Sequence, residues 1–333
     1  MLQPGDQQTW LPWDSPGAVA RFLDHYRPSV GVLMETEVWP TLVAECQARG
    51  LPLVLANARL SDKSLRAAQR LSVLSRAAYG ALFAVWAQTE ADAQRLRQLG
   101  APVKAVWGNL KFDATPDIGQ LAQGRAWRAA AAVPVVMLAS SREGEEEEFL
   151  RICAMGSDDT GRVQPRYLVV PRHPQRFEAV AEIAKGLGWR VSRRTTWGDQ
   201  GPPELSVTGA GPELWLGDSL GEMALYYGMS DVALLGGSFA PLGGQNLIEA
   251  AACGCPVVMG AHTFNFAEAA DQAHASGAAL RAEDMGDAMR QAIGLLADAP
   301  ARGATARAAS QFALAHQGAA QKTSAALAAM LQT

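Results

Sequence analysis

The stretch GGSFAPLGGQNLIEAAACGCPVVMG, residues 236–260, directly follows the apolar run DVALL. An apolar run that ends in glycines and continues into an alanine-rich segment predicts a buried strand, a tight turn and a short helix. The apolar run PVVMG at the end of the stretch predicts the next strand. A strand, a helix and a second strand in this order are typical of a parallel sheet covered by helices on both faces.

The same alternation of short apolar runs and longer amphipathic segments extends over the rest of the chain. In the N-terminal half it predicts strands at residues 30–35, 51–57 and 82–88. In the C-terminal half the runs VPVVMLAS, RYLVVPRHP, WRVSRR and PELWLGD predict further strands, and residues 301–332 are predicted to be helical. The polar segment 111–127 predicts a linker between the halves. We therefore predict an α/β protein with two consecutive doubly wound units.

The composition fits a large globular protein and excludes several classes of function. The chain has 333 residues, of which 49% are hydrophobic and 19% charged, and its net charge of −4 gives no basic field for a nucleic-acid partner. The four cysteines lack the spacing of a disulfide framework or a zinc site, which favours a reducing, cytoplasmic setting. No apolar run reaches the roughly 18 residues of a transmembrane helix.

The glycine-rich turn of residues 236–245 is the strongest candidate for a binding site. Glycines allow the backbone to approach a ligand closely, and the helix predicted to begin near Asn246 presents its N-terminus. Glu249 falls one turn into this helix, where a carboxylate can accept hydrogen bonds from both hydroxyls of a ribose. The turn lacks the lysine of a P-loop, so the pattern favours a sugar-nucleotide site; the alternative is an ordinary tight turn.

Two serines after the strand VVML form a second candidate. Ser140 and Ser141 precede a predicted helix, whose free backbone N–H groups and positive dipole end favour a phosphate. The alternative is ordinary helix capping, with residues 145–148 as a solvated first turn.

Two further polar turns follow predicted strands. In VPRHPQRF two prolines flank Arg172 and His173. The rigid prolines can hold the arginine in a position to pair with an anion; the alternative is a surface loop. In GDSLGE, Asp218, Gly221 and Glu222 form what is by itself a helix-capping signature.

In the N-terminal half, METEVWP places Glu35 and Glu37 on the same side of an extended strand end, because side chains alternate along a strand. Arg59 follows the next strand in NARLSDKS, and Lys111 lies in GNLKFD. A lysine at a cleft between two units can stabilise a leaving phosphate.

Eight motifs occur in the order of one family: METEVWP, NARLSDKS, GNLKFD, SSREGEEE, VPRHPQRF, GDSLGE, GGSFAPLGGQNLIEAA and MGAHTFNF. Over nearly its whole length the chain resembles the 3-deoxy-D-manno-octulosonic acid (Kdo) transferases of glycosyltransferase family 30. The resemblance implies a GT-B fold of two Rossmann-like domains. It implies a partial acceptor-binding domain at residues 1–113 and a CMP-Kdo-binding domain at 114–305. A C-terminal helix at 306–333 is then expected to pack back across the cleft.

The resemblance also implies a reaction and a set of site residues. Kdo would pass with inversion from CMP-Kdo to a hydroxyl of lipid A (lipid IVA) at the cytoplasmic face of the inner membrane, as part of lipopolysaccharide inner-core synthesis. Glu35 and Lys111 match positions that stabilise the transition state, and no metal or cofactor is implied. The predicted substrate-binding residues are Ser140, Ser141, Pro171, Arg172, Leu220, Gly221, Glu222, Asn246, Leu247, Ile248 and Glu249.

The chain departs from the family pattern in ways that bear on activity. Family members begin with a membrane-associating segment and a Ser-x-Gly-Glu motif whose glutamate is the general base. The chain starts after both, and its Gly-Glu pairs at 144–145 and 221–222 belong to other motifs. We expect an incomplete N-terminal domain with exposed apolar strand edges, and transfer slower by roughly 100- to 10,000-fold. Arg142 stands where histidine is usual, and Leu247 where proline is common.

Two other functions compete with the transferase. A nucleotide-sugar epimerase of the GT-B fold uses a similar glycine-rich, ribose-binding turn and would prefer a UDP-sugar. A non-catalytic remnant would bind CMP without transferring Kdo.

Overall fold

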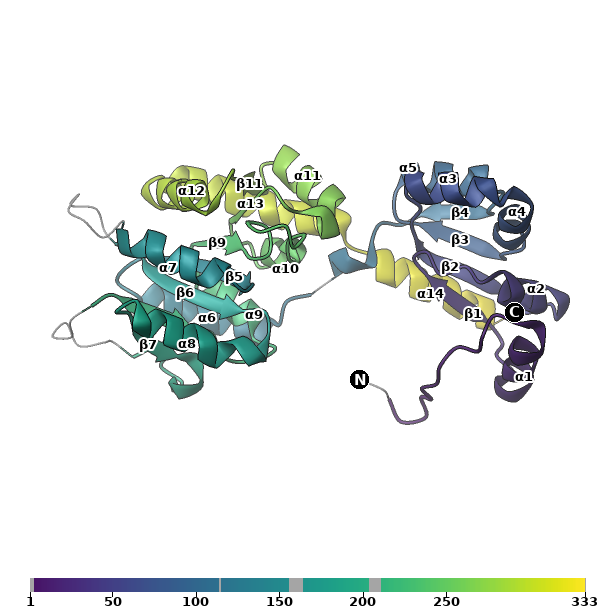
Figure 1. Cartoon of the computed structure of the whole chain (residues 1–333), viewed down its shortest axis with the longest axis horizontal. Helices are drawn as coiled ribbons and strands as arrows, with labels where there is room; N and C mark the ends of the chain where they lie inside the picture. The colour runs from purple at the N-terminus through teal and green to yellow at the C-terminus, as the bar shows by residue number, and fades with distance from the viewer. Residues whose placement is uncertain (1–2, 114, 156–163, 204–210, 333) are drawn as a thin grey trace. The chain divides into compact units, whose positions relative to one another are not determined.

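The computed structural model describes residues 3–113, 115–155, 164–203 and 211–332. These form two compact units, which are described separately (Figure 1). Unit 1 comprises Met1–Asp113 and His316–Thr333, and unit 2 comprises Ala114–Ala315. The chain leaves unit 2 at the end of helix α13 (Ala299–His316) and returns to unit 1.

Unit 1 contains a parallel sheet with strand order β1-β2-β3-β4. Its strands are β1 (Gly31–Met34), β2 (Leu53–Ala58), β3 (Ala84–Ala87) and β4 (Val103–Val106). Its helices are α1 (Pro16–Tyr26), α2 (Pro40–Ala48), α3 (Asp62–Arg70), α4 (Ser72–Gly80), α5 (Glu90–Gln98), the 3-10 turn η1 (Leu110–Asp113) and α14 (Ala319–Leu331). The first three strands confirm the sequence prediction, whereas β4 was missed because its run VKAV contains a lysine and is short.

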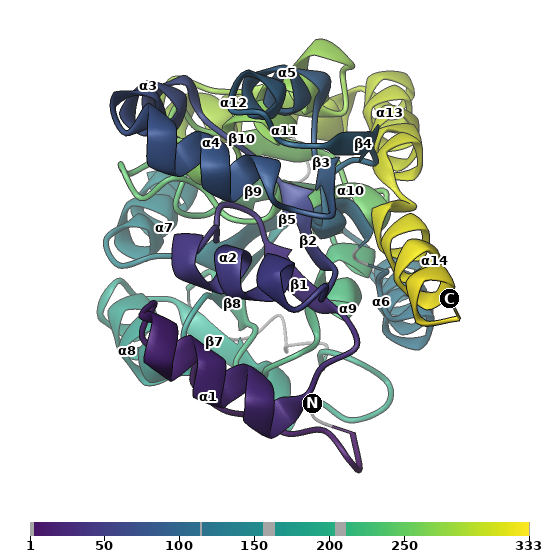
Figure 2. The same cartoon turned by 90° about the vertical axis from the view of Figure 1, so that its right-hand side faces the viewer.

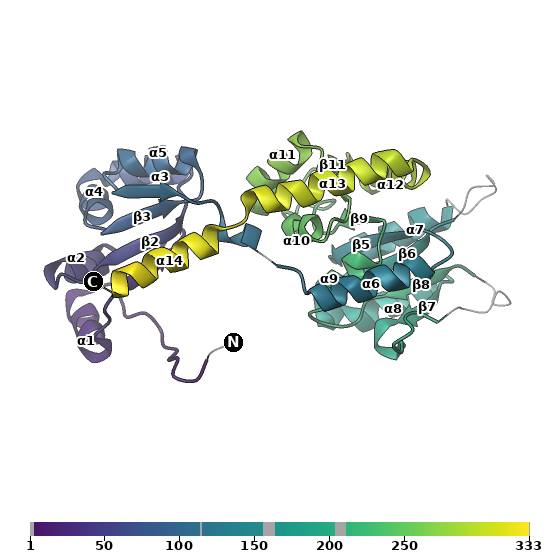
Figure 3. The ribbon, with the colours of Figure 1, turned by 180° about the vertical axis from the view of Figure 1, so that it is seen from behind.

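Helices cover both faces of the unit 1 sheet. The larger core lies between the sheet and the N-terminal helices, where Leu33, Leu55 and Val85 of the strands meet Val43 and Leu96 of α2 and α5. On the opposite face α14 packs over β2 and β3, as the view from behind shows (Figure 3). The edge strand β1 is less covered: Val32 and Met34 are 39% and 40% exposed.

Unit 2 contains a seven-stranded parallel sheet with the order β11-β10-β9-β5-β6-β8-β7. Its strands are β5 (Val135–Ser141), β6 (Arg166–Pro171), β7 (Arg190–Arg193), β8 (Glu213–Leu216), β9 (Val232–Leu235), β10 (Val257–Met259) and β11 (Ala279–Arg281). From β5 the chain continues to β6 on one side, and it later returns to β9 on the other side. The topological switch point, where ligands bind in sheets of this kind, therefore lies between β5 and β9.

Helices also cover both faces of this sheet. They are α6 (Ile118–Ala130), α7 (Glu145–Met155), α8 (Phe177–Gly186), α9 (Met223–Gly228), α10 (Leu247–Ala252), α11 (Ala267–Ala275), α12 (Met285–Ala297) and α13, with 3-10 turns η2 (Pro174–Arg176), η3 (Arg194–Thr196) and η4 (Phe264–Phe266). A core of the strands with α7, α8 and α12 occupies one face. In Figure 1, α7 and α8 lie in front of the sheet. In Figure 3, which views the ribbon from behind, α6 lies in front of it.

The predicted linker at residues 111–127 is wrong over most of its length, because α6 begins at Ile118. Asp117 caps this helix by accepting a hydrogen bond from the Gln120 N–H. A Cβ added to Gly124 would stand 2.2 Å from the Leu225 carbonyl oxygen, so glycine allows α6 to lie directly on α9. The polar composition of the segment concealed this buried glycine.

Candidate functional site

The glycine-rich turn of residues 236–245 begins at the switch point of the unit 2 sheet. The Gly236 N–H donates to the Ala139 carbonyl oxygen at 2.8 Å, which ties the end of β9 to the end of β5. A Cβ at Gly236 would lie 2.4 Å from the Ser140 carbonyl oxygen, so no larger residue fits without backbone movement. Gly237 has φ +70, a conformation that favours glycine. The glycines thus serve both close strand approach and turn geometry.

A buried carboxylate holds this turn in place. Both carboxylate oxygens of Glu145 accept from the Gly237 N–H at 2.8 Å, and one accepts from the Phe239 N–H at 3.3 Å. Glu145 also accepts from the Arg142 N–H at 2.9 Å. Its exposed fraction is only 2%, so the alternative of a solvated first turn is wrong for Glu145. Sequence reasoning missed it because four consecutive glutamates resemble an exposed helix start.

The next glutamate is also buried and supports the predicted phosphate-binding serines. Ser141 Oγ donates to Glu146 Oε1 at 3.1 Å, and Arg176 forms an ion pair with the same carboxylate at 3.3 Å. Burial raises the pKa of Glu146, while Arg176 and Ser141 oppose that rise. Ser140 has φ +53, a strained conformation for a residue other than glycine. Ser141 is only 1% exposed, whereas Ser140 is half-buried.

Arg172 contacts the glycine-rich turn, and Glu249 lies in the helix α10 that follows the turn. Arg172 Nε donates to Gln245 Oε1 at 3.2 Å, which brings the end of β6 to the turn. Asn246 caps α10 as predicted, accepting from the Ile248 N–H at 3.0 Å. Burial raises the pKa of Glu249, and the positive charge of Arg172 partly offsets this. The Glu249 side chain is half-buried.

Other predicted donor-site residues lie in less accessible positions. Leu247 and Ile248 are each 1% exposed, so their side chains belong to the core. Pro171 ends β6 and is buried.

The turn after β8 is built mainly from internal contacts. Glu222 forms an ion pair with Arg194 at 2.7 Å and accepts a hydrogen bond from Ser219 Oγ. The Gly221 carbonyl oxygen accepts from Gln120 Nε2 at 2.9 Å. Leu220 is 69% exposed and is the only side chain of the predicted 220–222 set that faces solvent to this degree. Glu222 thus stabilises the turn through these bonds.

In unit 1, Glu35 stands at the carboxyl end of β1 with φ +56. Its carboxylate pairs with the Arg59 guanidinium at 2.9 Å, and the Arg59 N–H donates to the Glu35 carbonyl oxygen at 3.3 Å. Glu37 instead accepts from the Trp39 indole N–H at 2.9 Å. The two glutamates of METEVWP therefore have separate partners, and only Glu35 joins the neighbouring strand end.

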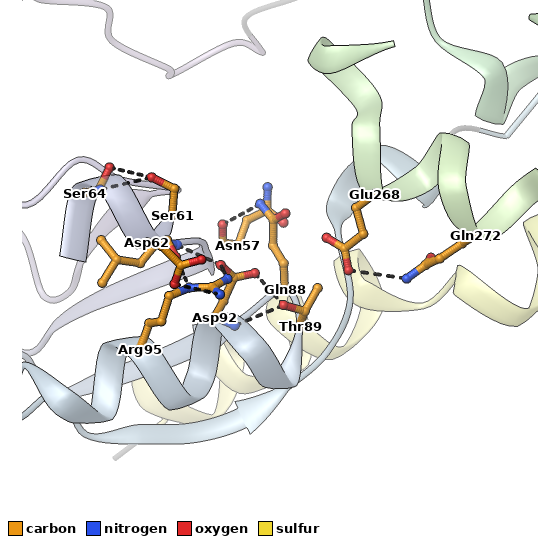
Figure 4. Close-up of polar contacts among 11 residues, drawn as sticks. Asn57, Ser61, Asp62, Ser64, Gln88, Thr89, Asp92, Arg95, Glu268 and Gln272 are labelled. Carbon is orange, nitrogen blue, oxygen red and sulfur yellow. Dashed lines mark hydrogen bonds and ion pairs between the residues drawn. The ribbon is translucent and has the colours of Figure 1, made fainter. Parts of the chain in front are cut away.

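Asn57 organises the carboxyl end of β2. It is 6% exposed with φ +51, and its carbonyl oxygen accepts from Gln88 Nε2 at 2.9 Å (Figure 4). Its side-chain oxygen accepts from the Leu110 N–H at 3.1 Å, which fixes the start of η1, the turn that carries Lys111. Sequence reasoning missed this buried asparagine, although its place inside NARLSDKS was a usable signal.

A side chain of α5 fixes the loop that carries Arg59 by a hydrogen bond. Asp92 accepts from the Leu60 N–H at 2.8 Å and from Thr89 Oγ1 at 2.6 Å (Figure 4). Arg95 pairs with Asp92 at 3.0 Å. This buried network had no signal in the sequence beyond an ordinary capping pattern. Among the described residues, no group of three or more His, Cys, Asp or Glu side chains is arranged to hold a metal ion.

Solved structures with low sequence identity define the class of fold. HepE of Anabaena in complex with UDP has a TM-score of 0.55 at 15% identity and covers 94% of this chain and 82% of its own. A putative UDP-N-acetylglucosamine 2-epimerase of Listeria monocytogenes has a TM-score of 0.54 at 13% identity, over 95% and 78%. These neighbours, with the two parallel-sheet units, show the predicted GT-B fold of two Rossmann-like domains.

Closer relatives define the family. The 3-deoxy-D-manno-octulosonic acid transferase of Bordetella pertussis is 47% identical over 95% of this chain and 73% of its own length. The transferase of Haemophilus influenzae is 33% identical over 78% and 59%. The C-terminal CMP-Kdo binding domain of WaaA from Acinetobacter baumannii is 29% identical, with a TM-score of 0.51 over 59% of this chain and 98% of that domain. Residues 1–114 match the family model described as 3-Deoxy-D-manno-octulosonic-acid transferase (kdotransferase).

The chain therefore belongs to the 3-deoxy-D-manno-octulosonic acid transferases, a family of glycosyltransferases. It spans 73% and 59% of the lengths of the two curated relatives just named.

Proposed function

We propose that this protein transfers Kdo from CMP-Kdo to a hydroxyl of a lipid A precursor at the cytoplasmic face of the inner membrane, in the synthesis of the lipopolysaccharide inner core. The observation that carries the donor assignment is the glycine-rich turn at the β5/β9 switch point, together with the likeness of unit 2 to a CMP-Kdo binding domain. The acceptor follows from the family.

In the proposed donor site, unit 2 binds the nucleotide through backbone and a few side chains. Glu249 accepts hydrogen bonds from the ribose hydroxyls, and Arg172 pairs with the phosphate. Ser140 and the N–H groups at the start of α7 face the same edge of the sheet and contribute donors to the phosphate. Glu145 does not touch the ligand; it fixes the turn that does.

The proposed reaction is a single displacement with inversion. The acceptor hydroxyl oxygen attacks the anomeric carbon of Kdo, the bond from that carbon to the phosphate oxygen breaks, and its electron pair leaves with CMP. The hydroxyl proton passes to a general base. Lys111 stabilises the departing phosphate, and Glu35 stabilises the positive charge that develops on the sugar. Neither residue is assigned as the base.

Two measurements on the whole chain test this proposal. Calorimetric titration is expected to show CMP binding, with UDP-N-acetylglucosamine binding far more weakly. Incubation with CMP-Kdo and lipid IVA, followed by mass spectrometry, is expected to show addition of Kdo. CMP binding with no transfer at any enzyme concentration would favour the non-catalytic CMP-binding protein, and preference for the UDP-sugar would favour an epimerase.

The described residues include no helix that combines the length and apolar character needed to cross a bilayer.

A further inference from the structure

Arg142 and Arg172 follow neighbouring strand ends at the carboxyl edge of the unit 2 sheet. Ser141 and Pro171 are register partners at the ends of the parallel strands β5 and β6, and each arginine is the residue that comes next. The Arg172 N–H donates to the Ser141 carbonyl oxygen at 3.0 Å. Because neighbouring strands lie about 4.8 Å apart, the two arginine side chains start from adjacent points of the backbone.

Both arginines contact the glycine-rich turn that follows β9. This strand is the other neighbour of β5 in the sheet, and Figure 2 shows the two side by side. The Cγ atom of Arg142 lies 3.5 Å from the position that a Cβ on Gly237 would occupy, and Nε2 of Gln245 lies 3.1 Å from the same position. Oε1 of Gln245 accepts a hydrogen bond from Arg172 Nε at 3.2 Å. One short turn therefore contacts two cationic side chains.

In the part of the chain that the structure describes, neither guanidinium forms an ion pair with an acidic side chain. The acidic residues that follow Arg142 have other partners. Glu143 and Glu146 both pair with Arg176 at 3.3 Å. The buried Glu145 carboxylate accepts hydrogen bonds from backbone N–H groups. Adjacent positive charges with no acidic side chain in ion-pair contact repel each other, and an anionic ligand removes this repulsion.

The proposed donor carries two anionic groups on one carbon atom. Kdo is a sugar acid whose anomeric carbon bears a carboxylate, and in CMP-Kdo the same carbon bears an oxygen of the CMP phosphate. The two negative charges are therefore only a few bonds apart, and a separate cation for each gives the strongest binding. A nucleotide derivative of a neutral sugar has no carboxylate at this position.

We propose that Arg142 binds the carboxylate of the donor sugar acid, while Arg172 pairs with the phosphate. This assignment rests on the proposed donor, CMP-Kdo, and names the residue that selects an acidic sugar over a neutral one. The backbone of Arg142 is fixed, because its N–H donates to the buried Glu145 carboxylate at 2.9 Å. Its half-buried side chain starts against Gly237. A guanidinium presents parallel N–H donors that match the two oxygens of a carboxylate.

This contact contributes to donor affinity more than to the rate of the chemical step. The carboxylate keeps its charge while the bond between the sugar and the phosphate breaks. The contact with Arg142 therefore stabilises the bound donor and the transition state to a similar extent. An interaction of this kind lowers KM and leaves kcat nearly unchanged. Arg142 is thus a specificity-determining residue.

Calorimetric titration of the whole chain with three ligands tests the assignment. The ligands are CMP, a phosphonate analogue of CMP-Kdo with a CH2 group in place of the oxygen between phosphorus and sugar, and the methyl ester of the carboxyl group of that analogue. We expect the wild type to bind the acid roughly 10- to 100-fold more tightly than the ester. Arg142→Met is expected to lose this preference and to bind CMP within about twofold of the wild type. Arg142→Lys keeps the charge and is expected to retain part of the preference.

Two further substitutions serve as controls. Arg172→Met is expected to weaken the binding of all three ligands, since each carries the phosphate or phosphonate. Arg151→Met on α7 removes an exposed arginine that pairs with Glu147 at 2.6 Å, and it is expected to bind all three ligands as the wild type does. Circular dichroism melts confirm that each variant is folded. With CMP-Kdo as substrate, Arg142→Met is expected to raise KM and to change kcat less.

Equal affinity of the wild type for the acid and the ester would overturn the assignment, as would an Arg142→Met variant that keeps the preference. A fall in CMP affinity as large as the fall for the acid would place Arg142 at the phosphate and would also overturn it. In each of these cases the wild type still binds CMP, so the proposed donor site stands. A wild type that binds none of the three ligands would refute the proposed function, and this assignment with it.

Discussion

At the carboxyl edge of the unit 2 sheet Glu145 is 2% exposed and holds two amides of the glycine-rich turn. At the carboxyl edge of unit 1, Glu35 makes an ion pair with Arg59, and the two side chains are 30% and 54% exposed. The first edge is fixed by buried hydrogen bonds before any ligand arrives, and the second carries its charges in partial contact with water. We therefore expect substitutions at the unit 2 edge to affect stability and ligand binding, and substitutions at the unit 1 edge to affect the rate of transfer.

The largest expected effect is that of Glu145→Gln. Loss of the charge weakens the hydrogen bonds to the Gly237 and Phe239 N–H groups, and we expect the free energy of unfolding of unit 2 to fall by about 2 kcal/mol. CMP affinity should fall with it, since the turn is no longer fixed. Urea denaturation, calorimetry and faster amide hydrogen exchange at Gly237 and Phe239 measure these effects.

The control for that substitution is Glu143→Gln on the same loop. The Glu143 side chain is 84% exposed and pairs with Arg176 at 3.3 Å, so its loss should change stability by less than about 0.5 kcal/mol. Unchanged hydrogen exchange at Gly237 in Glu145→Gln would contradict the view that this carboxylate fixes the turn.

The donor side also shows how far the sequence could predict the site. The glycine-rich turn and the Asn246 cap could be predicted because turn and capping residues are local signals that spacing alone reveals. The role of Glu249 stays a prediction. Glu145 was considered only as part of a solvated first turn, because its burial depends on the glycine-rich turn, which lies about ninety residues further along the chain. The fold class could be predicted from the alternating apolar runs. The strands β4 and β11 could not, because each is too short to show a period.

The second prediction concerns Glu249 and pH. Because burial raises the pKa of Glu249, its neutral form persists to a higher pH than for an exposed glutamate. A ribose that needs the carboxylate should bind less tightly as pH falls through this raised pKa. We expect Glu249→Gln to bind CMP on the order of tenfold more weakly at neutral pH and to lose this part of the pH dependence.

The CMP phosphate itself titrates with a pKa of about 6, so the wild type and the variant must be compared at each pH by calorimetry. Glu249→Gln keeps the part of the pH dependence of CMP affinity that comes from the phosphate. If both proteins lose affinity in parallel on acidification, Glu249 is not the ribose acceptor.

The third prediction examines strain on the acceptor side. Glu35 has φ +56, which costs a residue with a side chain about 1 kcal/mol more than glycine. Glu35→Ala and Glu35→Gly both remove the pair with Arg59, but only glycine relieves the strain. We expect Glu35→Gly to be more stable than Glu35→Ala by about 1 kcal/mol in thermal or urea unfolding.

Both variants should lose Kdo transfer while their CMP affinity stays that of the wild type. This outcome would show that the Glu35 carboxylate serves the transfer and not the binding of CMP. Equal stability of the two variants would remove the argument from strain, and weaker CMP binding would place Glu35 in the donor site.

The smallest expected effect on stability is that of Arg59→Ala. Its ion pair with Glu35 is partly exposed, and such pairs contribute about 0–1 kcal/mol because water screens them and ordering two long side chains costs entropy. Arg97→Ala on α5 is a matched control, because Arg97 pairs with Glu90 at 2.7 Å and both side chains are more than 45% exposed. We expect the two variants to unfold at nearly the same urea concentration. Only Arg59→Ala should slow transfer, since it alone releases Glu35. Equal transfer rates in the two variants would mean that Arg59 does not position Glu35, and the contrast between a fixed donor edge and a reactive acceptor edge would then rest on Glu35 alone.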